Sequence, residues 1–222
     1  MKNYDNNSNG YRQEAFISKS EHACQNWNSS LKRGDILSVL FVGVGGQGII
    51  LATMVVALAA INAGFDTKVS EVHGMAQRGG SVIGSVRAGK KVFSPTIKRA
   101  DFLVALEKLE GLRYLNMLSR GGYAIVNDYE IYPSTVFSKG GTYPVDIEAR
   151  VKSGAKNSFF INAVAVARKL KEIRASNTVL TGVLSRFLPF EYDCWINAIK
   201  ECVPQKAVRV NIEAFDSGRN HF

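Results

Sequence analysis

The chain has 222 residues, 46% of them hydrophobic and 21% charged, which is typical of a soluble globular protein. Its formal net charge is +9, but the basic residues are spread along the chain, so we expect anionic cofactors or an acidic partner rather than nucleic acid. The longest apolar run, Ile49 to Ile61, is too short for a membrane span, and the polar N-terminus has no signal core, which predicts a cytoplasmic protein with no membrane partner.

Residues 1–34 are rich in asparagine, serine and charged residues and contain few aliphatic ones. Such a composition buries little apolar surface, so we expect a poorly ordered extension. The aliphatic pattern begins at Ile36, and we place a single domain at residues 35–222.

The first part of this domain has the pattern of a βαβ unit. ILSVLFV (36–42) is a short aliphatic run of the kind found in buried parallel strands. Ile49 to Gly64 is long enough for a buried helix that ends at its glycine, and residues 67–72 form the next expected strand.

Further strands and helices alternate along the rest of the chain. Residues 81–97 are interpreted as two strands around Ala88-Gly89-Lys90, forming a hairpin inserted after the second strand. We expect strands at 101–107, 123–127 and 158–161, and helices at 111–120, at 162–173 and after Pro204. The fold class is therefore α/β, an open, mostly parallel Rossmann-like sheet with helices on both faces and an inserted antiparallel hairpin.

A glycine-rich loop joins the first strand to the first helix and is the first candidate binding site. Its glycines permit close approach of a ligand to the backbone, and the helix N-terminus favours an anion. The candidate cofactor-binding residues are Gly43, Gly45, Gly46, Gln47 and Gly48. A tight strand–helix crossover with no ligand is the alternative. A nicotinamide dinucleotide site would also need an acidic residue after the second strand, and Glu71 is only roughly in that place.

The second candidate is the segment SEVHGMAQRGGSV (70–82), which gathers several chemically active side chains on a loop broken by glycine. The Arg78 guanidinium suits a phosphate or carboxylate, and His73 is a candidate for proton transfer. Gln77 and Gly79 are grouped with Arg78 as candidate cofactor-binding residues. We expect this loop and the glycine loop to leave neighbouring strands and converge on one cleft. The alternative is that Glu71 pairs with Arg78 and His73 only packs.

Four motifs follow one another along the chain: GVGGQGII, SEVHGMAQRGGSV, LVALEKLEGLRYL (103–115) and VPQKAVRVNIEAFDSG (203–218). With these motifs the chain resembles the beta subunits of indolepyruvate ferredoxin oxidoreductases, the free-standing form of the gamma domain of 2-oxoacid:ferredoxin oxidoreductases. The resemblance covers about residues 36–218. It departs from the family pattern at Lys98-Arg99, where glycine often precedes the Ala-Asp that opens the next strand.

The resemblance implies a subunit of an enzyme that converts an aryl pyruvate, with CoA as co-substrate, into an aryl-acetyl-CoA, carbon dioxide and reduced ferredoxin. Thiamine diphosphate, Mg²⁺ and iron–sulfur clusters would belong to a larger alpha subunit, and ferredoxin would be a further partner. The three cysteines include no CxxC pair, so no usual cluster or zinc pattern is present and no metal site is expected on this chain. The alternatives are a non-catalytic stabilising subunit and a nicotinamide-dependent oxidoreductase.

Four further residues fit the family pattern. Glu107 and Arg113 fit its LE…R motif, and they either touch the site or cap and stabilise the following helix. Asn211 and Phe215 lie in the last expected helix, where packing is the favoured interpretation over partner contacts.

Overall fold

The structure is a computed structural model that describes residues 6–73, 80–132 and 143–221 and, within these ranges, the side chains other than those of residues 6–12 and 73. Its strands are β1 (Leu37–Val44), β2 (Asp66–His73), β3 (Ser81–Gly89), β4 (Ala100–Ala105), β5 (Leu118–Asn127) and β6 (Asn157–Ile161). Its α-helices are α1 (Asn6–Arg33), α2 (Ile49–Asn62), α3 (Lys108–Arg113), α5 (Ile147–Gly154), α6 (Ala163–Lys169), α7 (Ser176–Ser185), α8 (Tyr192–Cys202) and α9 (Val208–Arg219).

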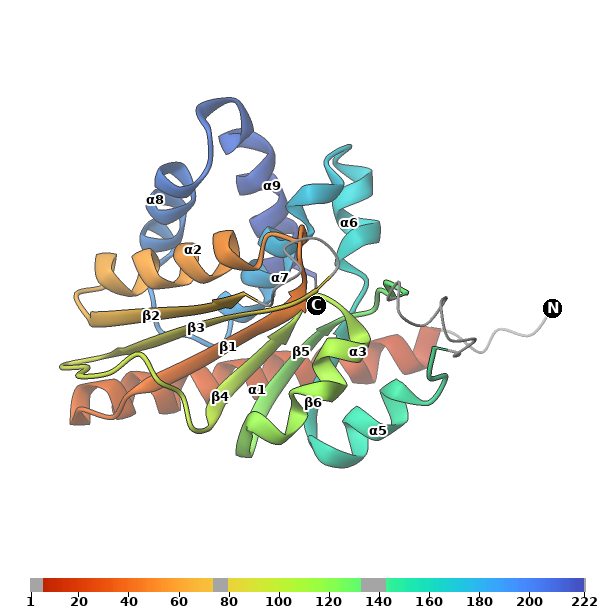
Figure 1. Cartoon of the computed structure of the whole chain (residues 1–222), viewed down its shortest axis with the longest axis horizontal. Helices are drawn as coiled ribbons and strands as arrows, with labels where there is room; N and C mark the ends of the chain where they lie inside the picture. Colours follow the sequence, from red (N-terminus) through yellow and green to blue (C-terminus); the bar gives the residue numbers. More distant parts are fainter. Residues whose placement is uncertain (1–5, 74–79, 133–142, 222) are drawn as a thin grey trace.

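The strands form one sheet in the order β2-β3-β1-β4-β5-β6 (Figure 1). β1, β4, β5 and β6 are parallel, whereas β3 runs antiparallel to both of its neighbours, β1 and β2. The predicted α/β class with a mostly parallel sheet is therefore confirmed. The strand, helix and strand expected between residues 36 and 72 are confirmed as well, and they correspond to β1, α2 and β2.

The expected hairpin over 81–97 is wrong in its second arm. β3 ends at Gly89, and the segment that follows is irregular. β3 already pairs with β1 on one edge and with β2 on the other, so no free edge remains for another strand beside it. Side chains hold the segment instead, since Asp66 Oδ2 accepts the Val92 N–H at 2.8 Å and Arg87 donates to the Ser94 carbonyl at 2.8 Å.

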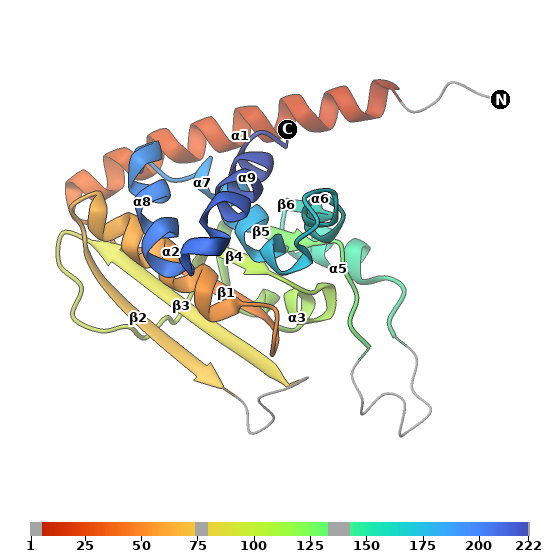
Figure 2. The ribbon, with the colours of Figure 1, turned by 90° about the horizontal axis from the view of Figure 1, so that it is seen from above.

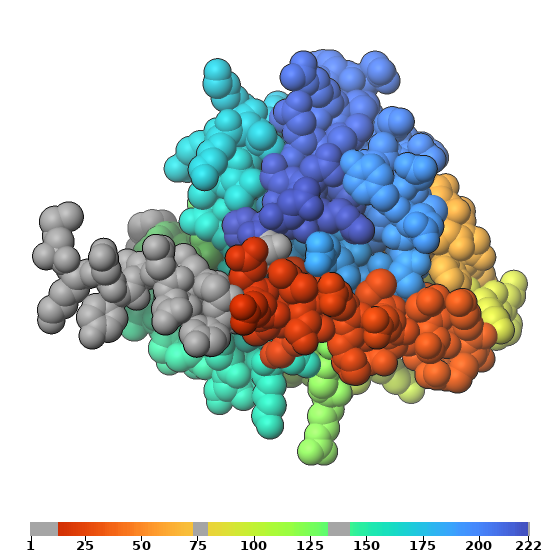
Figure 3. Space-filling view, turned by 180° about the vertical axis from the view of Figure 1, so that it is seen from behind, coloured from red at the N-terminus to blue at the C-terminus, as the bar shows by residue number. Residues whose placement is uncertain are grey.

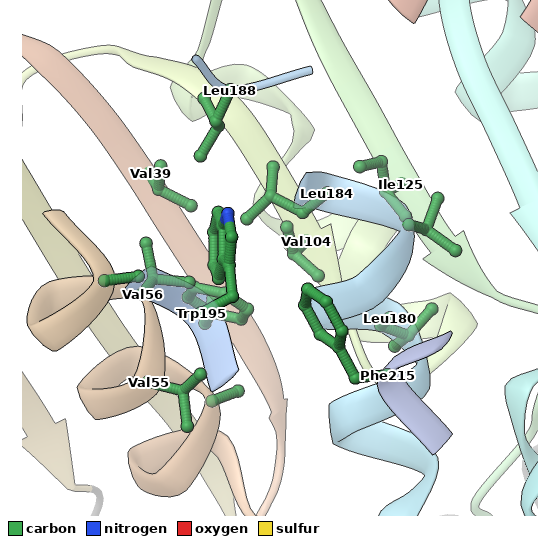
Figure 4. Packing of buried hydrophobic residues seen from close by; sticks show 14 of the residues in the cluster. Val39, Val55, Val56, Val104, Ile125, Leu180, Leu184, Leu188, Trp195 and Phe215 are labelled. Atoms are coloured by element: carbon green, nitrogen blue, oxygen red, sulfur yellow. The ribbon is translucent and has the colours of Figure 1, made fainter. Parts of the chain in front are cut away.

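Helices cover both faces of the sheet (Figures 1 and 2). One face is covered by α1, α2 and the helices from α6 to α9, and its core includes large residues such as Phe102, Phe187 and Trp195. The other face is covered by α3 and α5 and has a smaller core around Leu103 and Ile147. In the larger core, Trp195 of α8 and Phe215 of α9 lie between α2, α7 and the sheet, with ring centroids 5.7 Å apart (Figure 4).

Residues 6–33 form the helix α1, contrary to the poorly ordered extension expected for residues 1–34. Phe16 and Leu31 are each 1% exposed and Ala23 is 2% exposed. The Phe16 ring lies 5.0 Å from that of Phe159 and 5.2 Å from that of Phe187. The composition did not predict this helix because the segment contains few apolar residues. The apolar residues that are buried nevertheless recur at helical spacing and form one narrow stripe. The proposed domain boundary at residue 35 stays a prediction.

Candidate functional site

The chemically active segments lie at one edge of the sheet. The parallel strands β1, β4, β5 and β6 end there, as does β2, and β3 begins there because it runs in the opposite direction. The glycine loop leaves β1 at this edge, and β2 ends there at His73 (Figure 1). Sheets of this class bind ligands at the carboxyl ends of their strands, so this edge is the candidate site.

The glycine loop contains a tight turn followed by a helix start. The Gln47 N–H donates to the Val44 carbonyl at 3.1 Å, and Gly46 has a φ of +99°, the geometry of a type II turn that requires glycine. Gly48, with φ +77°, then precedes α2. These left-handed residues let the chain turn from β1 directly into α2.

The Gln47 side chain folds back and braces the loop. Its Oε1 accepts the Val44 N–H at 2.7 Å, and its Nε2 donates to the carbonyl of Leu106, the residue after β4, at 2.8 Å. A β-carbon at Gly43 would lie 2.7 Å from this Oε1, so Gly43 provides the space that Gln47 occupies. The contacts of Gln47 and Gly43 thus lie within the protein, and a cofactor role for them stays a prediction.

Two asparagines that the sequence patterns did not single out support the same loop. Asn127, at the end of β5, donates to the Leu106 carbonyl at 3.0 Å, and its Oδ1 accepts the N–H of Ala163 at 3.0 Å. Asn177, at the start of α7, donates to the Gly48 carbonyl at 3.0 Å. Both are 1% exposed. Asn127 could have been suspected from its place as the last residue of an expected strand, whereas Asn177 has no such signal.

Gly46 is the residue of the loop most open to a ligand. It is exposed, and a β-carbon there would meet no atom within 4 Å. Gly45, by contrast, uses its N–H to bond the Gly80 carbonyl at 2.9 Å. Within the described ranges no hydrogen bond engages the N–H of Gly46 or Gly48, and the N-terminus of α2 follows directly. The loop therefore has the features that accept an anion such as a phosphate.

The second candidate loop is only partly described. His73 is the last residue of β2, and its side chain is not described; Gln77, Arg78 and Gly79 lie outside the described residues. The two loops do not leave neighbouring strands as expected, because β3 lies between β1 and β2. The glycine loop nevertheless contacts Gly80, the first described residue after 74–79, since the Gly45 N–H donates to the Gly80 carbonyl.

The start of β3 is also anchored to α3. The Ser81 hydroxyl donates to Glu110 Oε2 at 2.5 Å and lies 3.2 Å from the hydroxyl of Tyr114. Glu110 is 4% exposed, and its other oxygen accepts Arg113 Nη1 at 2.7 Å. Arg113 therefore forms a salt bridge within its own helix. This agrees with the interpretation that Arg113 stabilises the helix.

Glu107 caps α3 and organises the segment that follows β5. It is 1% exposed, and one oxygen accepts the Glu110 N–H at 2.8 Å. The other oxygen accepts the Tyr143 hydroxyl and the Ile131 N–H. Burial, together with the nearby Glu107 carboxylate, raises the pKa of Tyr143 well above its usual value, so this hydroxyl stays protonated and keeps donating. The capping interpretation of Glu107 is confirmed.

Lys108 adds a further fixed charge at this edge. Its ammonium lies 3.0 Å from Asp128 and 2.6 Å from Glu130. Burial alone would lower the pKa of Lys108, but the hydrogen bonds to the two carboxylates outweigh burial and raise it. The amine therefore stays charged and holds the chain after β5 against α3.

Other expectations can be compared with the described residues. Phe215 is fully buried, and Asn211 accepts a hydrogen bond from Thr178 at 2.7 Å, so packing is confirmed for both. No group of three or more histidine, cysteine, aspartate or glutamate residues that could hold a metal occurs in the part of the chain that is described. Among the same residues, none of the helices combines the length and the apolar character that a membrane span requires.

The sheet order bears on the nicotinamide alternative. In dinucleotide-binding folds the strand that carries the ribose-binding acid lies directly beside the first strand. Here β3 lies beside β1 instead, and β2 with Glu71 lies one strand farther out. The distance between β1 and the strand that carries Glu71 is therefore two strand spacings of about 4.8 Å each instead of one. This arrangement does not favour a ribose contact by Glu71.

Comparisons with known proteins agree with this fold. The chain is 37% identical over 188 residues to the indolepyruvate oxidoreductase subunit IorB of Pyrococcus horikoshii, covering 82% of this chain and 93% of that protein. It is 36% identical over 190 residues to the Archaeoglobus fulgidus protein of the same name, covering 83% and 94%. The gamma subunit of a keto/oxoacid ferredoxin oxidoreductase from Geobacter sulfurreducens shares the fold, with a TM-score of 0.61, 23% identity and coverage of 82% and 95%.

A second solved structure, a 2-oxoglutarate:ferredoxin oxidoreductase from Magnetococcus marinus, has a TM-score of 0.67 at 20% identity and covers 83% of this chain and 30% of that one. The fold thus occurs both as a free-standing chain and as part of a longer one. Residues 38–221 match the family model for pyruvate ferredoxin/flavodoxin oxidoreductase, and this range includes the glycine loop and every described helix after α1. The chain belongs to the pyruvate ferredoxin/flavodoxin oxidoreductase family.

Proposed function

We propose that this chain is the small subunit of an indolepyruvate-type 2-oxoacid:ferredoxin oxidoreductase. The observation that carries the proposal is its similarity, over nearly their whole length, to relatives named as subunits of indolepyruvate oxidoreductases. The reaction is the oxidative decarboxylation of an aryl pyruvate with CoA, yielding an aryl-acetyl-CoA, carbon dioxide and reduced ferredoxin.

Under this proposal a larger alpha subunit supplies thiamine diphosphate, Mg²⁺ and iron–sulfur clusters, and this chain supplies binding and positioning. The glycine loop supports that role. Its exposed Gly46 and the N-terminus of α2 fit a phosphate group of a cofactor or of CoA, and Gln47 and Asn177 hold the loop in place.

Arg78 is proposed to bind the same anionic group, with Gln77 and Gly79 beside it and His73 as a candidate for proton transfer. The bond between Gly45 and Gly80 supports this assignment, because it ties the chain two residues after Arg78 to the glycine loop. A guanidinium adds a second, charged contact to the backbone N–H groups of the loop.

The test is the steady-state kinetics of the complex reconstituted with its alpha subunit, varying CoA and the 2-oxoacid separately. Arg78→Ala should lower the specificity constant for one of these two substrates about tenfold or more, because the variant loses one charge-assisted contact. Arg78→Lys should restore little if the contact is bidentate. Arg120→Ala, an exposed arginine at the opposite end of β5, is the matched control.

Two outcomes separate the alternatives. If the complex assembles normally and Arg78→Ala changes neither constant, the loop has no role in binding and the chain acts as a stabilising subunit. If the chain alone turns over an aryl pyruvate, or if no 2-oxoacid is oxidised by the assembled complex, the proposed function is wrong.

A further inference from the structure

A cleft of about 440 Å³ lies between α1 and the C-terminal helices. Figure 3 shows α1 running across this face beside the helices α7 to α9. One wall is the middle of α1, with Cys24 and Gln25, and the other is the end of α7 and the end of α9, with Arg186 and Arg219. Because the family match begins at residue 38, α1 completes this cleft with residues from outside the matched region.

Two guanidinium groups, those of Arg186 and Arg219, line the cleft. The Arg219 guanidinium donates one hydrogen bond, from Nη1 to the Ser185 hydroxyl at 2.8 Å, and the Arg186 guanidinium forms no hydrogen bond with the described residues. Neither guanidinium takes part in an ion pair among those residues. Burial lowers the pKa of Arg219, and the nearby positive charge of Arg186 lowers it further. Two like charges in one partly desolvated cleft repel each other, and a bound anion would relieve this repulsion.

The other charged residues of the cleft limit which anion fits. Two exposed carboxylates, Glu21 of α1 and Glu191 before α8, also line it. Their repulsion opposes the attraction of the arginines, and it is weakest for a ligand that carries a single negative charge. The volume lies within the range of small-molecule pockets. The planar fork of a guanidinium matches the two oxygens of a carboxylate.

We propose that the cleft between α1 and the ends of α7 and α9 binds a small organic monocarboxylate through Arg186 and Arg219. This site is separate from the glycine loop, because α7 extends from Asn177, which bonds Gly48, to Ser185 at the cleft, a rise of about 12 Å. The proposal does not depend on the reaction that the complex catalyses.

Isothermal titration calorimetry of the full chain tests the proposal, with benzoate as the carboxylate probe and inorganic phosphate as the comparison. Benzoate should bind at one site, and Arg186→Ala should weaken its binding about tenfold or more, the loss of a charge-assisted hydrogen bond. Arg168→Ala, an exposed arginine of α6, is the matched control and should leave the affinity unchanged. The Arg186 side chain has no hydrogen bond to lose among the described residues, so the alanine variant should fold.

Cys24 provides an independent measurement because its thiol lines the cleft. In a background with Cys194→Ser and Cys202→Ser, benzoate should slow the modification of Cys24 by a thiol reagent, and Arg186→Ala should abolish this protection. Burial raises the pKa of the Cys24 thiol, so the reaction is followed at alkaline pH. Absence of benzoate binding, equal binding by Arg186→Ala, or tighter binding of phosphate than of benzoate would each overturn the proposal.

Discussion

At Gly43 a β-carbon would lie 2.7 Å from the Gln47 side chain, whereas at Gly46 it would meet nothing within 4 Å. One glycine of the motif therefore makes room for a brace inside the protein, and another leaves the backbone open to a ligand. The sequence pattern predicted the loop and its place between a strand and a helix, but not this division of roles. The pattern also missed Asn177, because its contact with Gly48 joins residues that are far apart in the chain.

Asp101 predicts a pH dependence of stability. It lies at the start of β4, where it accepts the Ser38 N–H at 2.8 Å, and burial raises its pKa from 3.8 to about 6. Between these values the folded chain binds the proton more tightly than the unfolded chain, so the free energy of unfolding falls as pH rises from about 4 to about 6. Above about pH 6 this contribution to the free energy of unfolding no longer changes with pH.

Asp101→Asn should remove this decline and raise the free energy of unfolding at neutral pH, because an amide oxygen can still accept the Ser38 N–H. A shift of about two pKa units corresponds to at most about 3 kcal/mol. Urea unfolding at a series of pH values measures the effect, with the exposed Asp193→Asn as control. An unchanged decline in the Asp101 variant would contradict the assignment.

At the scale of elements, α7 and α9 pack unusually closely. A β-carbon at Gly182 would lie 2.1 Å from the Phe215 carbonyl oxygen, and one at Gly218 would lie 1.9 Å from that of Val179. Both obstacles are helix backbone, which cannot move aside as a flexible side chain could. This contact fixes α9 on α7, and with it the position of Asn211 against Thr178.

Gly182→Ala should therefore separate the two helices and lower the free energy of unfolding by about 1–3 kcal/mol, although alanine favours a helix more than glycine does. Asn197→Ala, on the exposed side of α8, tests the effect of an alanine where no helix approaches. Chemical denaturation of both variants measures the difference. A Gly182 variant as stable as the parent chain would show that the contact is looser than described.

The elements that the sequence predicted correctly have a strong local signal. β1, α2 and β2 follow from an aliphatic run, a long apolar helix and a glycine stop, all within one segment. The strand expected after Lys90 failed for a nonlocal reason, because β1 and β2 already occupy both edges of β3. Local patterns do not contain the order of strands in a sheet, and that order also decides which loops meet at the site.

At the scale of the whole molecule, α1 covers an aromatic surface formed by distant parts of the chain. Its Phe16 packs on Phe159 and Phe187, and its Trp27 ring lies 6.3 Å from that of Phe102. From composition alone, removal of residues 1–34 should leave folding intact. The structure predicts the opposite, because removal would expose these rings to water.

Phe16→Ala should lower the free energy of unfolding by about 3–5 kcal/mol, the usual cost of deleting a buried phenyl ring. Deletion of residues 1–34 should lower the melting temperature in the same direction. Ser18→Ala, at an exposed position of α1, is the matched control. Thermal and urea unfolding of the four proteins measure these changes, and an unaffected Phe16 variant would show that α1 contributes nothing to stability.

The contact between α1 and the rest of the chain also has a consequence for synthesis in the cell. Phe16 leaves the ribosome long before Phe159 and Phe187, the two rings that cover it. At about 5–20 residues per second, the nascent chain would carry this apolar stripe uncovered for roughly ten seconds or more. During that interval the stripe is available to molecular chaperones, which bind such exposed segments, so α1 is the first described helix to be made and one of the last to reach its final position.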